Sequence, residues 1–420
     1  MNFHFEPVRW SLNTNLYEVN LRQYTSEGTF QAFGNELPRL YDMGVNILWF
    51  MPITPISKEK RLGTLGSYYS CSNYTDTNPE FGTVQDFIHL VKKAHHIGFK
   101  VIIDWVANHT GWDHAWVKKH PGFYKRNAAG DFYDSNGWED VIDLNYYDQA
   151  MRREMILSME FWVKECNIDG FRCDMAHLVP LDFWRDARMH LDQVKPLFWL
   201  AETEHQNYQH VFDCSYAWHW MHVSENFAKK RTNIEELRST LLEYNKKKLP
   251  QTTHLFFTSN HDENSWNGTE YEKYGNAALP FAVLINMWNG LSLTYSGQEI
   301  PNRKRLNFFE KDPIQWNYTN ELHSFYKALF NTRKSFGEEQ TEILMLHPKG
   351  DRHVIAFLRF SRLKQVLVII NLSDTSHEIV LEESLISGTY SDIFTSKKHE
   401  APSLKNLMME PWSYLVLEKL

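Results

Sequence analysis

The chain has 420 residues, 43% of them hydrophobic and 23% charged, which is typical of a globular protein with a large domain and one further domain. The net charge of −8, without segments that combine clustered Lys and Arg with aromatic residues, argues against a nucleic-acid partner. No apolar run reaches the roughly 18 residues that a transmembrane helix needs, so no membrane partner is expected.

The N-terminal segment MNFHFEPVRW lacks a basic stretch followed by an apolar one, so no signal peptide is expected in the chain as given. A cytoplasmic location is expected, or export if a signal has been removed. The four cysteines show neither metal-ligand spacing nor closely spaced pairs, and they are expected to be buried free thiols.

The first third of the chain alternates short apolar runs with helical patterns. Strands are predicted at residues 16–21, at 45–51 and from 100 onward. Helices are predicted at 30–43, ending at Gly44 as C-cap, and at 83–98, beginning at Thr83 as N-cap. The long loop at 52–82 is expected to be ordered and functional.

Residues 106–147 are rich in Trp, His, Gly and Asn without helical period, and they are predicted to leave the main domain as an insertion. Further helices are predicted at 149–166, 180–194, 233–248, 277–288 and 321–336. Further strands are predicted from 168, from 197, near 215–223, from 254 and at 291–295. This alternation predicts a (β/α)₈ barrel built from residues 1–105 and 148–336.

Beyond residue 337 the pattern changes to short β-branched runs without helices, at 353–360, 365–371, 378–381 and 413–417. These predict a C-terminal antiparallel β-sandwich over residues 337–420. The predicted fold is therefore of the α/β class: a (β/α)₈ TIM barrel with a short inserted domain B (106–147) after the third strand and a C-terminal sandwich.

Charged side chains follow four of the predicted barrel strands. Arg172 and Asp174 lie two positions apart, so they share one face of a strand. Asp104, Glu202 and Asp262 each follow another apolar run, and a barrel brings the carboxyl ends of all its strands to one face. Asp174 alone would fit a plain helix N-cap, but the repetition favours an active site.

Two carboxyl groups can break a glycosidic bond when one attacks the sugar and the other protonates the leaving oxygen. Arg172 is expected to keep Asp174 ionised, and burial at a strand end is expected to raise the pKa of Glu202 for proton donation. His261 and Asp262 supply groups that bind sugar hydroxyls.

Five motifs carry a resemblance to a known family: DWVANH (104–109), VIDLN (141–145), GFRCD (170–174), the Glu of LAETE (200–204) and FTSNHD (257–262). In these motifs, and in its domain order, the chain resembles the α-amylase family of glycoside hydrolases and transglycosylases. The resemblance implies that Asp174 is the nucleophile, Glu202 the general acid/base and Asp262 the carboxylate that stabilises the transition state.

The resemblance also implies a substrate-binding set made of Tyr69, Asp104, His109, Arg172, His177 and His261. Tyr68 is an alternative counterpart for Tyr69, and Asp104 has the alternative of a purely structural ion pair. His177 and Leu178 stand where many relatives carry Lys-His, which argues against endo-acting starch cleavage.

Asn108 and Asp143 match family calcium ligands, and oxygen ligands suit this ion. The sequence therefore allows a calcium ion there, with the alternative that Asn108 only braces its loop. No organic cofactor is expected.

The predicted function is that of a retaining α-glycoside hydrolase that cleaves α-1,4-glucosidic bonds in starch-type glucans or maltooligosaccharides by double displacement. The α-glucan or oligosaccharide substrate is the expected partner. Two alternatives stay open: a transglycosylase or a trehalose- or sucrose-type α-glucosyl enzyme on the same scaffold, and an inactive glucan-binding protein.

Overall fold

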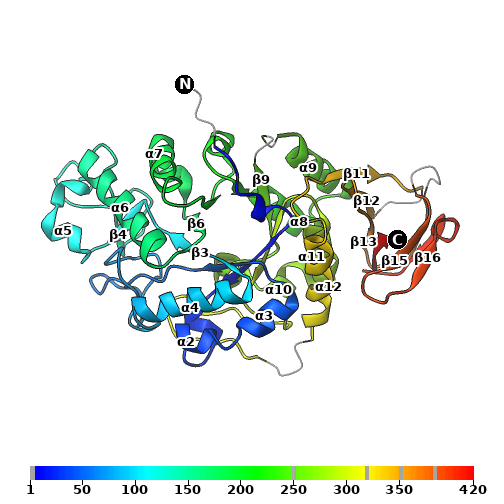
Figure 1. Cartoon of the computed structure of the whole chain (residues 1–420), viewed down its shortest axis with the longest axis horizontal. Coiled ribbons are helices and arrows are strands. Elements are labelled where there is room, and N and C mark those ends of the chain that lie inside the picture. The colour runs from blue at the N-terminus through cyan, green and yellow to red at the C-terminus, as the bar shows by residue number, and fades with distance from the viewer. Residues whose placement is uncertain (1–4, 248, 250–251, 317–320, 350–352, 382–385) are drawn as a thin grey trace.

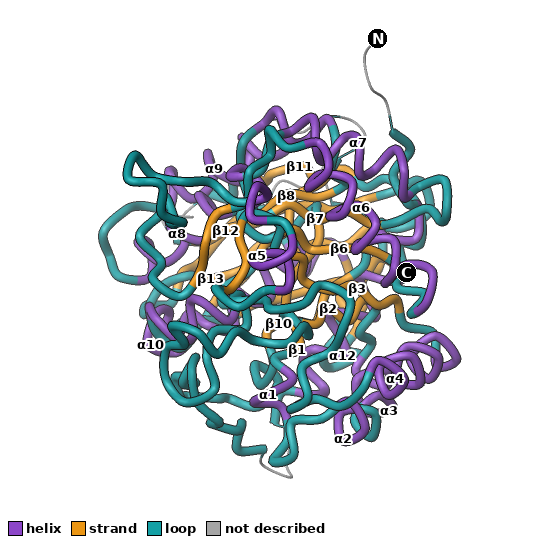
Figure 2. Tube along the Cα trace, turned by 90° about the vertical axis from the view of Figure 1, so that its left-hand side faces the viewer, coloured by secondary structure: helices purple, strands orange, loops and turns teal. Residues whose placement is uncertain are grey.

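The computed structural model describes residues 5–247, 249, 252–316, 321–349, 353–381 and 386–420. Eight parallel strands close into a barrel in the order β1-β10-β9-β8-β7-β6-β3-β2, with helices around it (Figures 1 and 2). The barrel strands are β1 (Asn15–Val19), β2 (Ile47–Phe50), β3 (Lys100–Trp105), β6 (Gly170–Cys173), β7 (Phe198–Ala201), β8 (Cys214–Tyr216), β9 (Thr253–Phe256) and β10 (Leu291–Tyr295). The predicted (β/α)₈ barrel is confirmed.

The α-helices of the described residues follow the predicted alternation. They are α1 (Leu21–Tyr24), α2 (Phe30–Phe33), α3 (Leu37–Met43), α4 (Val84–Ile97), α5 (Ala115–Lys119), α6 (Gln149–Glu165), α7 (Leu181–Leu191), α8 (Trp218–Ala228), α9 (Ile234–Lys247), α10 (Glu270–Tyr274), α11 (Ala278–Met287) and α12 (His323–Lys334). Gly44 ends α3 with a φ of 93°, and Thr83 starts α4 in a capping box with Asp86, as predicted. Lys248, the predicted end of α9, lies outside the described residues.

Two predicted elements were wrong in their extent. The single helix at 30–43 is two helices, because Gly34 caps α2 and Pro38, which has no backbone N–H, lies in the first turn of α3. The strand at 215–223 ends at Tyr216, and the apolar residues after it form α8. Short apolar runs fit a buried strand and a buried helix equally well, so periodicity alone misassigned this one.

The inserted segment leaves the barrel after β3 and returns at α6. It contains α5 and a two-stranded antiparallel sheet of β4 (His109–Gly111) and β5 (Val141–Asp143). Because this sheet starts immediately after a barrel strand, it places one edge of the insertion at the mouth of the barrel.

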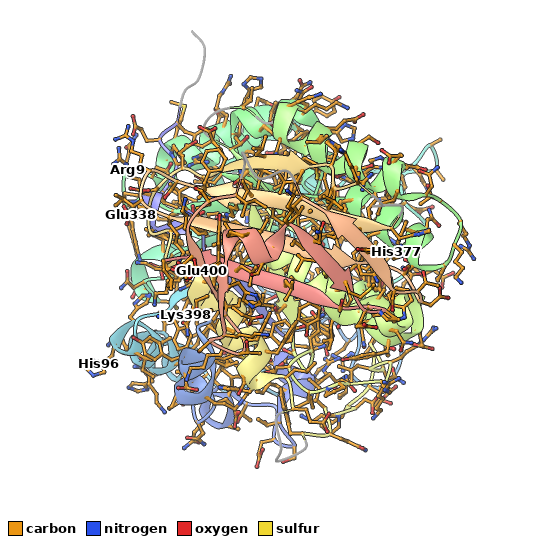
Figure 3. All side chains as sticks on the ribbon, turned by 90° about the vertical axis from the view of Figure 1, so that its right-hand side faces the viewer. Arg9, His96, Glu338, His377, Lys398 and Glu400 are labelled. Carbon is orange, nitrogen blue, oxygen red and sulfur yellow. The ribbon has the colours of Figure 1, made fainter. Side chains whose placement is uncertain are left out.

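The C-terminal domain is antiparallel and made of two sheets, with orders β11-β12-β13-β18-β15-β16 and β14-β17. Figure 3 views the molecule from this domain, with Lys398 and Glu400 on β16 and His377 on β14. The strands are β11 (Glu342–Leu346), β12 (Val354–Phe360), β13 (Gln365–Asn371), β14 (His377–Val380), β15 (Thr389–Asp392), β16 (Lys398–Glu400), β17 (Asn406–Met409) and β18 (Tyr414–Lys419). The sequence missed β11, β15, β16 and β17, whose short and partly exposed runs carry little β-branched signal.

The apolar core of the barrel domain has two layers, one inside the barrel and one between its strands and the surrounding helices. One face of each strand fills the barrel interior, with Leu16, Trp49, Ile102 and Leu200 among its members, and the other face packs against the helices. All four cysteines are buried and free, as predicted. Among the described residues no helix has the length and apolar character needed to cross a membrane.

Candidate active site

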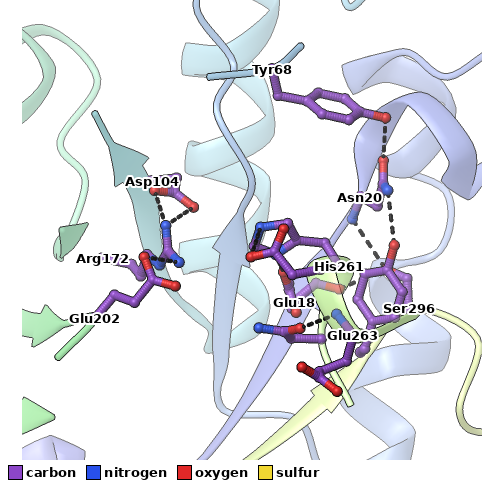
Figure 4. Close-up of polar contacts among 12 residues, drawn as sticks. Glu18, Asn20, Tyr68, Asp104, Arg172, Glu202, His261, Glu263 and Ser296 are labelled. Atoms are coloured by element: carbon purple, nitrogen blue, oxygen red, sulfur yellow. Dashed lines mark hydrogen bonds and ion pairs between the residues drawn. The ribbon is translucent and has the colours of Figure 1, made fainter. Parts of the chain in front are cut away.

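The alternation of strand side chains decides which residues enter the site. Ile102 and Leu200 point into the barrel interior, so Asp104 and Glu202, two positions later, point the same way at the carboxyl ends of their strands. Arg172 lies on the neighbouring strand β6, in register with Asp104 on one side and with Leu200 on the other. The strand ends therefore bring these three side chains together, as the sequence predicted (Figure 4).

Arg172 is the centre of this cluster and is fully buried. Its Nη1 donates to Asp104 Oδ1 and to Asp174 Oδ1, each at 2.9 Å. Its Nη2 lies 2.8 Å from Glu202 Oε2 as an ion pair, without the alignment of a hydrogen bond. The rings around its guanidinium are those of Trp49, Tyr69 and Tyr216. One guanidinium thus holds three carboxylates, two of them the predicted nucleophile and acid/base.

Burial sets the electrostatics of these carboxylates. Burial raises the pKa of Asp174 well above its ordinary value, Arg172 lowers it, and the neighbouring carboxylate of Glu202 raises it further. Burial likewise raises the pKa of Asp104 to about 6, although Arg172 opposes the shift. Arg172 is therefore the group that favours the ionised form of Asp174, against burial and the neighbouring carboxylates.

Met175 shapes the backbone immediately after the predicted nucleophile. It has a left-handed conformation with φ 40° and ψ 46°, which is uncommon for a residue with a side chain. In this conformation its N–H donates to Glu202 Oε2 over 2.8 Å. The strained residue therefore orients Glu202 next to Asp174.

Tyr69, His261 and Asp262 form the opposite side of the site. The Tyr69 hydroxyl lies 3.2 Å from Asp104 Oδ2 and 2.6 Å from His261 Nε2, and its ring stacks on the imidazole. Asp262 Oδ2 lies 3.3 Å from the same Nε2. Tyr68 instead is buried, and its hydroxyl donates to Asn20 Oδ1, so the structure places Tyr69 and not its neighbour at the site.

His109 and His177 have different environments. His109 begins β4 and is buried, and burial lowers its pKa to about 4, so its imidazole is neutral near pH 7. His177 is exposed at the rim of a cavity of about 590 Å³. The structure therefore places both at the mouth, with only His177 open to solvent.

That cavity lies beside Glu202 and contains residues that the sequence did not reveal. Its lining consists of Met175, His177, Glu202, Thr203, Glu204, His205, Trp218, His222 and Asp262. Trp218 and His222 lie one turn apart at the start of α8, which was misread as a strand. If residues 218–228 had been predicted as a helix, the spacing of four positions would have placed Trp218 and His222 on the same face.

The predicted calcium ligands lie together, but they do not fit an ion. Asp143 is fully buried, and its Oδ2 already accepts from Lys125 Nζ (2.9 Å) and from the Ser135 hydroxyl (2.5 Å). Asn108 directs its Nδ2, a donor, at Asp143 Oδ1 over 3.4 Å. An ammonium group and an amide N–H group thus lie where a cation would need free oxygen ligands.

Comparison with known proteins identifies the family. The chain matches the α-amylase catalytic domain over residues 12–140 and 123–340, and the α-amylase C-terminal all-beta domain over 347–409. The chain belongs to the α-amylase family. The resemblance predicted from the five motifs is thereby confirmed.

Individual relatives are distant in sequence. An α-amylase of Dictyoglomus thermophilum is 27% identical over 227 residues, and the α-amylase MalA of Haloarcula japonica is 24% identical over 419 residues. These matches cover 46% and 92% of the chain, and 43% and 60% of the relatives' own length. The crystal structure of a maltogenic α-amylase, AmyB of Thermotoga neapolitana, superposes with a TM-score of 0.89 at 28% identity, covering 97% of this chain and 99% of that one.

Proposed function

We propose that the chain hydrolyses α-1,4-glucosidic bonds in starch-type glucans or maltooligosaccharides with retention of configuration. The observation that carries this proposal is the cluster in which Arg172 holds Asp174 and Glu202 at the mouth of an α-amylase family barrel. The near full-length match to a maltogenic α-amylase supports the same substrate class.

The reaction would proceed in two displacements. Asp174 attacks the anomeric carbon while Glu202 protonates the leaving oxygen, which gives a covalent glucosyl enzyme. Glu202 then takes a proton from water, which attacks the same carbon and releases Asp174. Asp262 and His261 bind hydroxyls of the reacting sugar, and Arg172 favours the ionised form of Asp174, which burial and the neighbouring carboxylates disfavour.

A product time course on maltoheptaose and soluble starch tests the function. Hydrolysis predicts only shorter maltooligosaccharides, first released as the α-anomer in proton NMR spectra. Products longer than the heptaose would instead identify a transglycosylase. If folded protein gave no product from either substrate, the proposal would be wrong.

The variant Asp174→Asn tests the nucleophile. It removes the attacking charge but keeps the side-chain shape, so we expect turnover to fall by at least about 10⁴-fold while the thermal unfolding temperature stays within a few degrees. Residual activity near that of the wild type would assign the nucleophile elsewhere.

We propose further that the place between Asn108 and Asp143 holds no calcium, because the ammonium group of Lys125 already neutralises Asp143. Exhaustive treatment with a chelator should then leave both the thermal unfolding temperature and the turnover unchanged. Loss of either on chelation, with recovery on adding calcium, would contradict this.

A further inference from the structure

Glu18, a carboxylate of β1 that the mechanism above does not use, reaches the active site from the barrel interior. It follows Leu16 on the inward face of the strand and is fully buried. Its Oε1 lies 2.5 Å from Nδ1 of His261, and its Oε2 has no hydrogen-bond partner among the described residues (Figure 4). A buried carboxylate is costly unless it faces a positive charge, so the state of the imidazole matters.

The number of protons in the network points to a charged imidazole. Three contacts follow one another, from Glu18 to His261, from His261 to Tyr69 and from Tyr69 to Asp104. With ionised carboxylates at both ends, each contact has a hydrogen only if both ring nitrogens donate and the Tyr69 hydroxyl donates to Asp104. A neutral imidazole would leave one contact with two acceptors facing each other unless Glu18 held the proton; burial raises the pKa of Glu18, and the contact with His261 lowers it.

The groups around His261 favour the same state. Glu18 faces it from β1, Asp262 from the residue that follows it, and Arg172 from β6. Burial alone would lower the pKa of the imidazole, but the negative charges of Asp262 and Glu18 outweigh burial and Arg172, and they raise it to about 9. The remaining neighbours are the rings of Trp49, Tyr69 and Phe308.

We propose that Glu18 is a positioning residue that keeps His261 as an imidazolium in the resting enzyme. The imidazolium then donates to the Tyr69 oxygen and attracts Asp262, so that both groups are in place before substrate binds. The part of this inference that concerns catalysis rests on the proposed function; the charge state of His261 does not.

Nitrogen-15 NMR of the histidine side chains tests the charge state directly. The His261 signal, assigned by its loss in His261→Gln, should show two protonated ring nitrogens in the wild type at pH 7 and should titrate near pH 9. A neutral ring at pH 7 in the wild type would overturn the proposal. This outcome needs neither a variant of Glu18 nor any enzymatic activity.

The variant Glu18→Gln, compared with Glu299→Gln, tests the positioning role. Glu299 is an equally buried carboxylate beside β1, but it pairs with Arg39 and Tyr17 instead of His261. We expect Glu18→Gln to make His261 neutral at pH 7, and to lower kcat/KM about tenfold to a hundredfold through misplaced groups. In the pH profile of kcat/KM for this variant, the decline on the alkaline side should also begin about one pH unit lower than in the wild type.

Glu299→Gln should change stability while leaving the His261 signal and the pH profile as in the wild type. Equal effects of the two variants on the His261 signal would overturn the proposal. If neither substrate is hydrolysed even by the wild type, the proposed function fails, yet the NMR comparison still decides whether Glu18 sets the charge of His261.

Discussion

At the residue scale, some residues of the five motifs are needed for the packing of the strands and not for the reaction. Gly170 opens GFRCD, and a Cβ atom there would lie 2.1 Å from the carbonyl oxygen of Phe198 on the adjacent strand. The glycine is therefore required by the close approach of β6 and β7, which brings Arg172 and Glu202 into contact.

Gly170→Ala should consequently destabilise the fold by about 3 kcal/mol or more, because the added methyl group must displace backbone atoms. Denaturant unfolding at pH 7 measures the loss. Gly122→Ala is the control, since the nearest atom to a Cβ there is 3.8 Å away, and it should unfold like the wild type. If the two variants had the same denaturant midpoint, strand β7 would be able to shift and accept the methyl group at little cost.

Asp169, immediately before β6, should control stability in acid. The carboxylate is buried, but His95, Lys195 and the Val101 N–H bind it and lower its pKa to about 2. Because the folded pKa lies below the unfolded value, its contribution of about 2 kcal/mol is present above pH 4 and disappears as the pH falls to about 2. The stability difference between wild type and Asp169→Asn should therefore be full at pH 7 and shrink below pH 4; a constant difference would refute this.

At the element scale, an ion pair between Lys125 and Asp143 joins two parts of the inserted segment, with 2.9 Å between Nζ and Oδ2. Lys125 pairs with Asp143 on β5, and β5 pairs with β4, whose first residue is His109. The sequence predicted the insertion and its place after β3, but not Lys125, because the partner of a lone lysine is decided by how the loop folds back.

Lys125→Met should leave Asp143 as a buried unpaired carboxylate and destabilise the protein by about 3 kcal/mol. It should also loosen His109, so KM should rise more than kcat falls. Thermal unfolding and steady-state kinetics measure both effects. If added calcium restores the stability of Lys125→Met but leaves the wild type unchanged, the ammonium group of Lys125 takes the place of a metal ion. A variant as stable and as active as the wild type would contradict the prediction.

At the scale of the whole molecule, the barrel and the C-terminal domain share a buried polar contact. Arg359 of β12 is fully buried and donates to Asn13 Oδ1 at 2.6 Å and to the Trp288 carbonyl at 3.2 Å. Beside it, the ring of Phe357 packs edge-on against Trp288 at 5.1 Å. Because these groups would be unsatisfied if the domains separated, the two domains should unfold together.

Calorimetry should accordingly show one unfolding transition for the wild type. Arg359→Met should lower its stability by about 3 kcal/mol, since several buried acceptors lose their donor. Arg362→Met, the same change at an exposed position two residues after the end of β12, should have no effect. Two separate transitions in the wild type would mean that this contact does not couple the domains.

The sequence by itself determined the barrel, the order of its strands, the insertion, the all-β C-terminal domain and the carboxylates at the strand ends, because strand alternation and motif spacing are local properties of the chain. The roles assigned to those carboxylates stay predictions. Only the tertiary structure decided that Tyr69 and not Tyr68 enters the site, that Glu18 faces His261 and that Lys125 neutralises Asp143. Each of these contacts joins residues from separate elements, and their partners depend on how strands and loops pack.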